Sequence, residues 1–319
     1  PHVLNGRDVM GLAQTGTGKT AAFGLPIAHR LMENRVKPLP KSTHALILAP
    51  TRELAKQIQE AIKSFVRGSP IRVGMVVGGL SINPQIHKLQ KGMDILVATP
   101  GRLIDLLDRR AVTLEHTHYL VLDEADQMLD LGFIHALRQI SKLLPIQKQT
   151  MLFSATMPKL MSEIADTYLN QPIRIEVSPP GKVADKITQF VHFVTQGDKP
   201  DLLKKLLSHH QAKRSLVFSR TKHGAEKLMK NLIRQGFTAN SIHGNKSQGQ
   251  RDRALQAFKD GSINVLVATD VAARGIDIPE VDFVFNFDLP NVPENYVHRI
   301  GRTARAGASG IAIAFCSMT

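Results

Sequence analysis

The segment from Ala13 to Thr20 reads AQTGTGKT and has the residue types needed to hold a phosphate group. It fits the phosphate-loop pattern G-x-x-x-x-G-K-[S/T], except that alanine stands where the pattern has its first glycine. Successive backbone N–H groups of such a loop surround a phosphate, and bulky side chains at Gly16 and Gly18 would obstruct them. We therefore predict a nucleotide site formed by Gln14, Thr15, Gly16, Thr17, Gly18, Lys19 and Thr20.

In this site Lys19 would reach the outer phosphates, and the Thr20 hydroxyl would bind Mg²⁺. The alternative is an incidental turn rich in glycine and threonine. The lysine and the hydroxyl directly after the last glycine argue against that alternative.

Two adjacent acids, Asp123 and Glu124, follow an apolar run that is typical of a buried strand. Adjacent carboxylates at such a place are costly unless a cation lies between them. We predict that Asp123 holds Mg²⁺ through water, and that Glu124 orients and deprotonates an attacking water. The alternative is a helix N-terminus rich in acids, where carboxylates are favourable for another reason.

The arginines Arg302 and Arg305 lie three residues apart, which would place both on one face of a helical turn. A guanidinium on the γ-phosphate increases the rate of phosphoryl transfer by about 10³ to 10⁵. The pair comes from the half of the chain without a phosphate loop, so this role would couple hydrolysis to movement of two domains. The alternative is a pair of surface arginines that contact solvent or phosphate.

Arg52 and Arg102 each stand where a predicted strand end meets a helix N-terminus, the preferred place for an anion. Neighbouring hydroxyls and glycines add donors for a second row of phosphates: Thr51, Gly78, Gly79, Thr99 and Gly101. Tryptophan is absent and there are only 3 tyrosines, so stacking on bases is not expected to dominate. We predict contacts to a nucleic-acid backbone without sequence preference.

The bulk composition agrees with a polyanionic partner. The formal net charge is +14, and lysine and arginine exceed the acids in both halves of the chain. A solvated basic surface is the alternative. A single cysteine excludes an internal disulfide framework, so a cytoplasmic location is expected. No run of 18 apolar residues occurs, and no membrane partner is predicted.

Strand, polar turn and helix alternate along the chain, which predicts an α/β fold with mostly parallel sheets and helices on both faces. Continuous apolar runs such as ALILA at 45–49 are typical of parallel strands buried on both sides. The alternating stretch 173–177 predicts an edge strand. Ligands gather beyond the carboxyl ends of parallel strands, so the polar clusters are expected to share one rim.

The stretch SPPGK at 178–182 interrupts regular structure near the middle of the chain. We therefore predict a domain at 1–177, a linker at 178–186 and a second domain at 187–319. Apolar periodicity predicts helices at 19–32, 225–235 and 248–258. Predicted strands include 8–12, 45–49, 73–77, 94–98, 119–122 and 150–153, then 215–218, 265–267 and 283–286.

Together these motifs resemble those of the DEAD-box ATP-dependent RNA helicases over nearly the whole chain. Residues 13–20 resemble motif I, 50–55 motif Ia, 78–79 the GG doublet, 99–102 motif Ib, 123–126 the DEAD motif and 154–156 motif III. Further along, 216–220 resemble motif IV, 248–251 the Q-x-x-R element, 268–277 motif V and 298–305 motif VI. The spelling at 302–307 is most similar to the bacterial RhlE-type branch.

The resemblance implies two RecA-like domains, acting as a monomer, that close on ATP, Mg²⁺ and single-stranded RNA and separate short duplexes. RNA contacts are implied for Pro50, Thr51, Arg52, Gly78, Gly79, Thr99, Pro100, Gly101, Arg102, Ser219, Arg220, Gln248, Arg251, Thr269 and Asp270. Nucleotide contacts are implied for Gly275 and Asp277, and arginine fingers for Arg302 and Arg305. Coupling of hydrolysis to closure is implied for Asp126, Ser154, Thr156 and His298.

Two departures from the family pattern are visible. The Q motif, which reads adenine, would lie upstream of Pro1, so the chain is expected to be an excerpt. Ala304 replaces a frequent glycine between the two arginines. Two other functions stay open at this point: a DNA-translocating helicase of the same superfamily, and an ATP-gated RNA clamp whose hydrolysis only resets binding.

Overall fold

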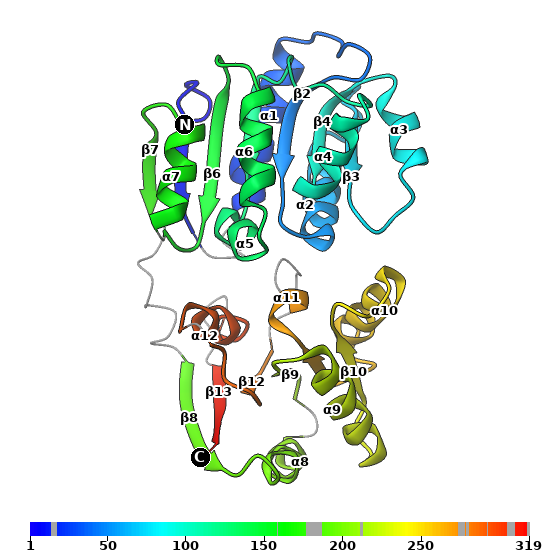
Figure 1. The fold of residues 1–319 in the computed structure, drawn as a ribbon, viewed down its shortest axis with the longest axis vertical. Helices are drawn as coiled ribbons and strands as arrows, with labels where there is room; N and C mark the ends of the chain where they lie inside the picture. The colour runs from blue at the N-terminus through cyan, green and yellow to red at the C-terminus, as the bar shows by residue number, and fades with distance from the viewer. Residues whose placement is uncertain are drawn as a thin grey trace. The chain divides into compact units, whose positions relative to one another are not determined.

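The computed structural model describes residues 1–13, 18–157, 159–176, 187–210, 213–273, 278, 281–291, 293–304 and 310–317. The chain divides into two compact units, Pro1–Pro180 and Gly181–Thr319. Figure 1 shows both units, each with a sheet between helices. The predicted linker at 178–186 lies outside the described residues.

The sheet of the first unit has seven parallel strands in the order β3-β4-β2-β5-β6-β1-β7. Its strands are β1 (Val9–Leu12), β2 (Thr43–Leu48), β3 (Val73–Val76), β4 (Met93–Ala98), β5 (Tyr119–Leu122), β6 (Gln149–Ser154) and β7 (Ile173–Glu176). Its helices are α1 (Lys19–Glu33), α2 (Arg52–Phe65), α3 (Asn83–Leu89), α4 (Pro100–Asp108), α5 (Ala125–Asp130), α6 (Ile134–Leu143) and α7 (Lys159–Tyr168). The predicted edge strand is confirmed as β7.

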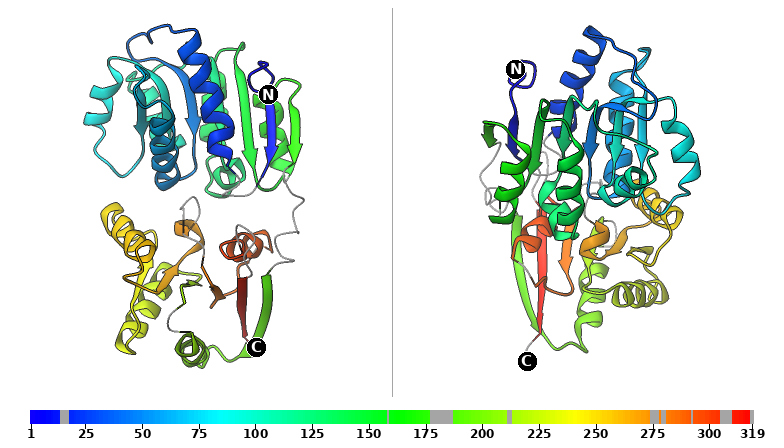
Figure 2. Two further views of the ribbon diagram at one scale, coloured as in Figure 1. Left: turned by 180° about the vertical axis from the view of Figure 1, so that it is seen from behind. Right: turned by 45° about the horizontal axis from the view of Figure 1, so that its top comes forward.

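Both faces of this sheet are covered by helices. Along β2, Ala45 and Ile47 pack with α1 and α2, whereas Leu46 and Leu48 face the opposite way and pack with α3 to α7. Successive side chains of a strand point to opposite faces, so a strand buried on both sides needs an unbroken apolar run. Figure 2 shows α1 and α2 from behind, on the face turned away in Figure 1.

The second unit has six parallel strands in the order β10-β11-β9-β12-β13-β8. Its strands are β8 (Ile187–Val194), β9 (Ser215–Phe218), β10 (Ala239–Ile242), β11 (Val265–Ala268), β12 (Phe283–Asn286) and β13 (Gly310–Ser317). Its helices are α8 (Lys199–His209), α9 (Lys222–Arg234), α10 (Gln248–Lys259), α11 (Asp270–Ala273) and α12 (Pro293–Ile300). Helices α8 and α9 pack on one face, and α10 and α12 pack on the other.

Strand β8 forms one edge of the second sheet, and in the described part of the chain no strand pairs with its outer side. Three of its apolar side chains are well exposed: Phe190 at 47%, Val191 at 56% and Phe193 at 69%. Its sequence, ITQFVHFV, contains neither lysine nor proline. Natural edge strands are commonly protected by such residues, so this edge is unusually open.

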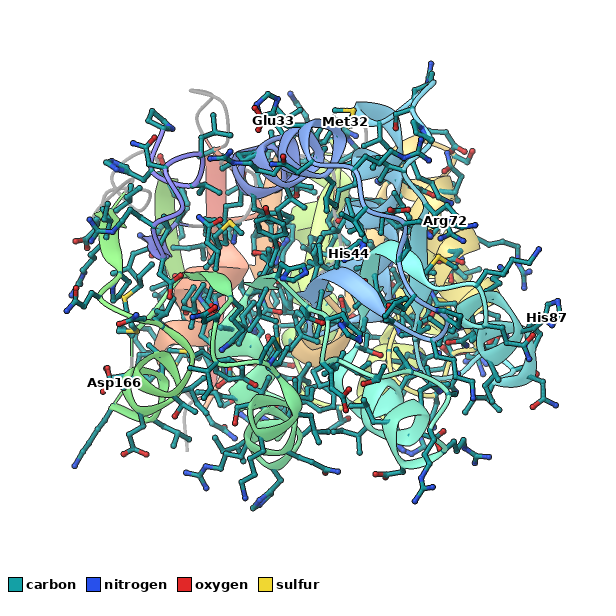
Figure 3. All side chains as sticks on the ribbon, turned by 90° about the horizontal axis from the view of Figure 1, so that it is seen from above. Met32, Glu33, His44, Arg72, His87 and Asp166 are labelled. Atoms are coloured by element: carbon teal, nitrogen blue, oxygen red, sulfur yellow. The ribbon has the colours of Figure 1, made fainter. Side chains whose placement is uncertain are left out.

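Figure 3 shows the first unit from above, at the amino edge of its sheet, where His44 lies near the start of β2. The His44 ring stacks on that of His118 with centroids 5.7 Å apart, and its Nε2 lies 3.0 Å from the Val36 carbonyl oxygen. Burial, together with the neighbouring His44 and His116, lowers the pKa of His118. The predicted motifs lie at the other, carboxyl edge. No helix among the described residues has the length and apolar character to cross a membrane.

Candidate nucleotide and nucleic-acid sites

The predicted nucleotide residues of the first unit follow the carboxyl ends of three adjacent strands and therefore lie close together. The order β5-β6-β1 sets the end of the DEAD strand, the end of the motif III strand and the start of the phosphate loop side by side. The Ala13 N–H donates to the Ser154 carbonyl oxygen at 3.0 Å and so continues the β1–β6 ladder beyond the strands. Residues 14–17, which hold part of the predicted loop, lie outside the described residues.

Lys19 is the first residue of α1 and is buried. Its Nζ lies 3.5 Å from Oδ1 of Asp123 and donates to the Ala13 carbonyl oxygen at 3.3 Å. Gly18 caps the helix in the left-handed conformation, with φ 82°, a conformation that glycine adopts without steric cost. The first N–H groups of a helix have no partner within the helix, so the α1 terminus offers donors to an anion beside the Lys19 ammonium.

Glu124 is buried and has a left-handed backbone with φ 52° and ψ 51°. Its N–H donates to Oδ1 of Asp123 at 3.0 Å. A residue with a Cβ reaches this conformation at a cost of about 1–3 kcal/mol, and such strain persists where the surroundings enforce it, often at functional sites. The turn separates the two adjacent acids, since Asp123 faces Lys19 whereas Glu124 is the N-cap residue that precedes α5.

Asp126 joins the DEAD segment to the segment after β6. Its Oδ2 accepts hydrogen bonds from the Ala155 N–H at 3.1 Å, the Thr156 N–H at 3.0 Å and the Thr156 hydroxyl at 3.0 Å. Ser154 does not contact Asp126 in these bonds; its hydroxyl donates to the Thr156 carbonyl oxygen at 2.6 Å. The three residues predicted to couple hydrolysis to closure in this unit therefore form one connected network.

This arrangement fits ATP and Mg²⁺. A buried ammonium beside the free donors of a helix terminus suits phosphate oxygens, and Mg²⁺ prefers carboxylate and hydroxyl oxygens of the kinds that Asp123 and Thr20 supply. The Lys19–Asp123 contact also keeps two buried charges balanced. The described residues hold no group of three or more His, Cys, Asp or Glu that would bind a metal without substrate oxygens.

The residues predicted to bind a nucleic-acid backbone gather at the carboxyl ends of β2, β3 and β4, which are neighbours in the sheet. Gly79 has φ 72°, and a side chain there would collide with the Arg52 guanidinium, so this guanidinium lies directly against the glycine. Arg102 donates from Nη2 to the Leu80 carbonyl oxygen at 3.0 Å, and the Gly78 N–H donates to the Thr99 hydroxyl at 3.4 Å.

Thr51 caps α2, since its hydroxyl accepts from the Leu54 N–H at 3.3 Å. Its neighbour Pro50 precedes that cap, and Pro100 and Gly101 form the first turn of α4. The whole predicted set of the first unit is therefore on one rim, where two arginines and two helix N-termini face the same region. Such a rim favours phosphates.

In the second unit, a buried arginine to which the sequence analysis gave no role connects several site residues. Arg299 is 2% exposed and binds both carboxylate oxygens of Asp270, with Nε–Oδ1 at 2.6 Å and Nη2–Oδ2 at 2.7 Å. Its Nη1 donates to Asn286 Oδ1 at 3.0 Å and to the Asp288 carbonyl oxygen at 2.6 Å. The guanidinium also lies 4.9 Å from the centre of the Phe218 ring, a favourable cation–π contact.

Arg299 binds both carboxylate oxygens of Asp270. We therefore expect the predicted contact of Asp270 with RNA to use its backbone groups and not its side chain. Thr269, beside it, is buried and donates its N–H to the Ile242 carbonyl oxygen at 3.2 Å. His298 and Arg302 line a small hollow together with Asp270 and Arg299. This grouping brings the predicted motif V and motif VI side chains of the described chain together.

Helix α12 ends at Ile300, so Arg302 lies in the turn that follows it. The face that Arg302 is predicted to share with Arg305 stays a prediction. The turn forms because the N–H groups of Arg302 and Thr303 bond back to the carbonyl oxygens of Arg299 and Ile300. Gly275, Asp277 and Arg305 lie outside the described residues.

Ser219 and Arg220, at the end of β9, are fixed by Asp288. The Asp288 Oδ2 accepts from the Ser219 hydroxyl at 3.2 Å and from the Arg220 N–H at 2.9 Å. The Arg220 side chain is exposed. On α10, Gln248 donates to Asp252 at 2.9 Å and Arg251 donates to the Ala272 carbonyl oxygen at 3.4 Å. The Arg251 bond ties the Q-x-x-R element to α11.

Glu226 on α9 is a second residue that the motifs did not indicate. Its Oε2 accepts from the Ser241 hydroxyl at 2.8 Å and lies 3.0 Å from both His243 Nε2 and Lys246 Nζ. The hydrogen bond from His243, followed by those from Lys246 and Ser241, lowers the pKa of Glu226 to about 2. Glu226 thus holds the segment that leads from β10 to Gln248. Nothing in its residue type or spacing signals this role.

The family comparisons agree with this geometry. Residues 1–164 match the DEAD/DEAH box helicase model, and residues 198–307 match the helicase conserved C-terminal domain. The chain therefore belongs to the DEAD/DEAH box helicase family. It is 46% identical over 315 residues to the ATP-dependent RNA helicase CshA of Listeria monocytogenes. This match covers 99% of the chain but 60% of that relative's length. The RhlE-type branch stays a prediction.

Solved structures show the same fold. Dbp5 of S. cerevisiae bound to RNA and ADP BeF3 has a TM-score of 0.84 and 34% identity, covering 98% of this chain and 80% of that one. A DEAD box protein from the hyperthermophile Methanococcus jannaschii has a TM-score of 0.55 and 37% identity, covering 99% and 84%. The predicted fold class, two RecA-like units with parallel sheets, is confirmed.

Replacing Arg299 by methionine is expected to destabilise the second unit by about 3–5 kcal/mol, because it leaves the Asp270 carboxylate without its buried partner. Urea unfolding of the full chain, followed by circular dichroism, measures the change. Arg253→Met on the exposed side of α10 is the matched control and should change the free energy of unfolding by less than about 0.5 kcal/mol. Equal effects of the two substitutions would contradict the central role of Arg299.

Glu226→Gln is expected to weaken the dependence of stability on acid. A depressed pKa contributes stability that is present above the ordinary value of 4.5 and is lost as the pH falls toward the folded value of about 2. The urea midpoint of the parent should therefore decline more steeply than that of the variant between about pH 5 and pH 2. Asp201→Asn, at an exposed position on α8, is the control and should follow the parent curve.

Proposed function

We propose that this chain is the catalytic core of an ATP-dependent RNA helicase, which hydrolyses ATP in response to RNA and opens short duplexes. The observation that carries the proposal is the buried Lys19–Asp123 pair with Glu124 held beside it in a left-handed turn. Family membership supports ATP as the nucleotide, and the RNA-bound structure of Dbp5 supports RNA as the partner.

Bound ATP would supply the γ-phosphoryl group, with Mg²⁺ neutralising the charge on its oxygens. Lys19 and the α1 N-terminus would hold the outer phosphates, and Thr20 and Asp123 would hold the metal, Asp123 through water. Glu124 would accept the proton of the attacking water at its carboxylate. The turn at Glu124 fixes the position of this base, so little reorganisation is needed when it acts.

We infer that closure of the two units completes this site. Arg302 and Arg305 would act as arginine fingers on the γ-phosphate, and Gly275 and Asp277 would contact the nucleotide, Asp277 at its ribose. Asp126 is already bound to Thr156, so a shift of the segment after β6 would move the DEAD segment with it. His298 would connect motif VI to the same change.

RNA would lie along the rim formed by Arg52, Gly79 and Arg102 in the first unit, and along Arg220, Gln248 and Arg251 in the second. Contacts of this kind neutralise phosphates and read no base, so binding should weaken steeply with salt. We further propose that the chain acts as a cytoplasmic monomer, with domains bounded as the sequence predicts.

The test is steady-state ATPase activity of the chain without nucleic acid, with single-stranded RNA and with single-stranded DNA. Strong stimulation by RNA alone is the expected result, and a duplex with a single-stranded extension should then be opened in an ATP-dependent manner. Equal stimulation by DNA would indicate a DNA-translocating helicase. ATP-dependent RNA binding without duplex opening would indicate an RNA clamp.

Glu124→Gln is expected to lower turnover by about 10²-fold or more, because the general base is lost while the shape of the side chain is kept. Affinity for ATP and for RNA should change by less than about 3-fold, since neither depends on proton transfer. Turnover and equilibrium titration with a fluorescent ATP analogue measure the two effects. Glu115→Gln, in the exposed loop before β5, is the control. Turnover near that of the control would show that another group is the base.

A further inference from the structure

A groove of ≈ 860 Å³ opens between α8 and α9 of the second unit, on the sheet face opposite α10 and α12. Its volume is within the range of about 300–1,000 Å³ that is usual for binding pockets. One wall is a single face of α9, formed by Gly224, Lys227, Leu228, Asn231 and Arg234. These residues recur every three or four positions, so they align along the helix. The proposed ATPase chemistry does not use this surface.

The groove carries positive charge without a counter-ion of its own. Arg220, Lys227 and Arg234 are exposed along it, and within the described part of the chain none of them forms an ion pair. The acid that lines the described groove, Asp288, is already engaged: its Oδ1 lies 3.6 Å from Lys199 Nζ, and its Oδ2 accepts from Ser219 and Arg220. A ligand with carboxylates would therefore find unpaired cations.

The floor of the groove is apolar, with contributions from Leu228 and Phe287. The Phe287 ring is 8% exposed, and the buried Lys199 ammonium lies 5.7 Å from its centre. The ring is therefore not free to stack on a base. Sites for single-stranded nucleic acids combine a positively charged groove with exposed aromatic rings. This groove has the positive charge, but its described lining offers no exposed aromatic ring.

The cations also have a definite spacing. Lys227 and Arg234 are seven residues apart on α9, which corresponds to two turns, or about 10.5 Å along the axis. A second helix with acids seven residues apart repeats the same distance. Its apolar side chains at intermediate positions would lie over the stretch of α9 that carries Leu228 and Asn231. Recognition of an amphipathic helix in a groove uses this combination of an apolar centre and charged borders.

We propose that the α8–α9 groove binds an acidic amphipathic helix of a partner protein. The carboxylates opposite Lys227 and Arg234 set the orientation and exclude basic helices, and the floor adds apolar contact. Arg220 lies at the end of the same groove and also belongs to the predicted RNA contacts. A partner helix in the groove would therefore compete with RNA for contact with Arg220.

The test uses fluorescence anisotropy with a labelled synthetic helix on the full chain. The helix has leucines at i, i+4 and i+7 and glutamates seven residues apart on the borders of that face, and a second peptide has lysine in place of glutamate. The acidic peptide is expected to bind at least about 10-fold more tightly than the basic one at low salt. Equal binding of the two peptides would overturn the proposal.

Lys227→Glu and Arg234→Glu should each weaken binding of the acidic peptide by about 5-fold or more, because each replaces attraction by like-charge repulsion. Lys205→Glu makes the same charge change at an exposed position of α8 outside the groove, and should change affinity by less than about 2-fold. Both groove side chains are exposed, so unchanged melting temperatures are expected.

Two results would contradict the assignment. One is an equal loss of affinity with Lys205→Glu, which would indicate a general charge effect. The other is a loss of affinity for a U-rich single-stranded RNA with the groove variants while peptide binding is unchanged, which would make the groove an RNA surface. Basal ATPase activity reports separately on the proposed function, because neither Lys227 nor Arg234 belongs to the catalytic residues.

Discussion

All strands of a parallel sheet end at the same edge, and this constraint places every candidate site in the molecule. In the first unit, motifs that are far apart in the chain meet because β3, β4 and β2, and then β5, β6 and β1, are neighbours in the sheet. The first group brings Arg52 against Gly79, and the second brings Lys19 to Asp123. The nucleotide region and the phosphate-binding rim therefore lie along the same edge of one sheet.

Each unit places a buried cation beside an acid where its strands end, but the two pairs differ in kind. Lys19 meets Asp123 through a single contact of 3.5 Å and donates to the Ala13 carbonyl oxygen, so the ammonium retains one donor that a phosphate can use. Four of the five N–H donors of Arg299 instead bond to Asp270, Asn286 and Asp288, and its side chain is 2% exposed. The first pair is suited to exchange partners during a reaction, whereas the second fixes the end of the sheet. Loss of Asp123 or Asp270 would leave the buried Lys19 or Arg299 without compensation.

The sequence predicted most of the central strands, because strands buried on both sides need unbroken apolar runs. It did not predict β8, whose side chains are mostly exposed, nor the short helices α3, α6 and α7. Helix α8 was also missed, although Leu202, Leu203, Leu206 and Leu207 have helical spacing.

Among site residues, motif spellings located the rim and the nucleotide region. They did not indicate the roles of Arg299 or Glu226, because residue type alone does not distinguish a charged side chain with several protein partners from one surrounded by solvent. The face expected for Arg302 and Arg305 stays a prediction, since α12 ends at Ile300 and Arg305 lies outside the described residues.

The open edge at β8 has a practical consequence for handling the protein. Strand β8 pairs with β13 on one side only among the described residues, and its exposed Phe190, Val191 and Phe193 leave the other side open to a strand of a neighbouring molecule. Concentrated samples would then gather into oligomers through the backbone, independently of nucleotide or RNA. A lysine in place of Phe193, the most exposed of the three, would introduce the charge that natural edges use to keep molecules apart, and would make the chain easier to crystallise as a single species.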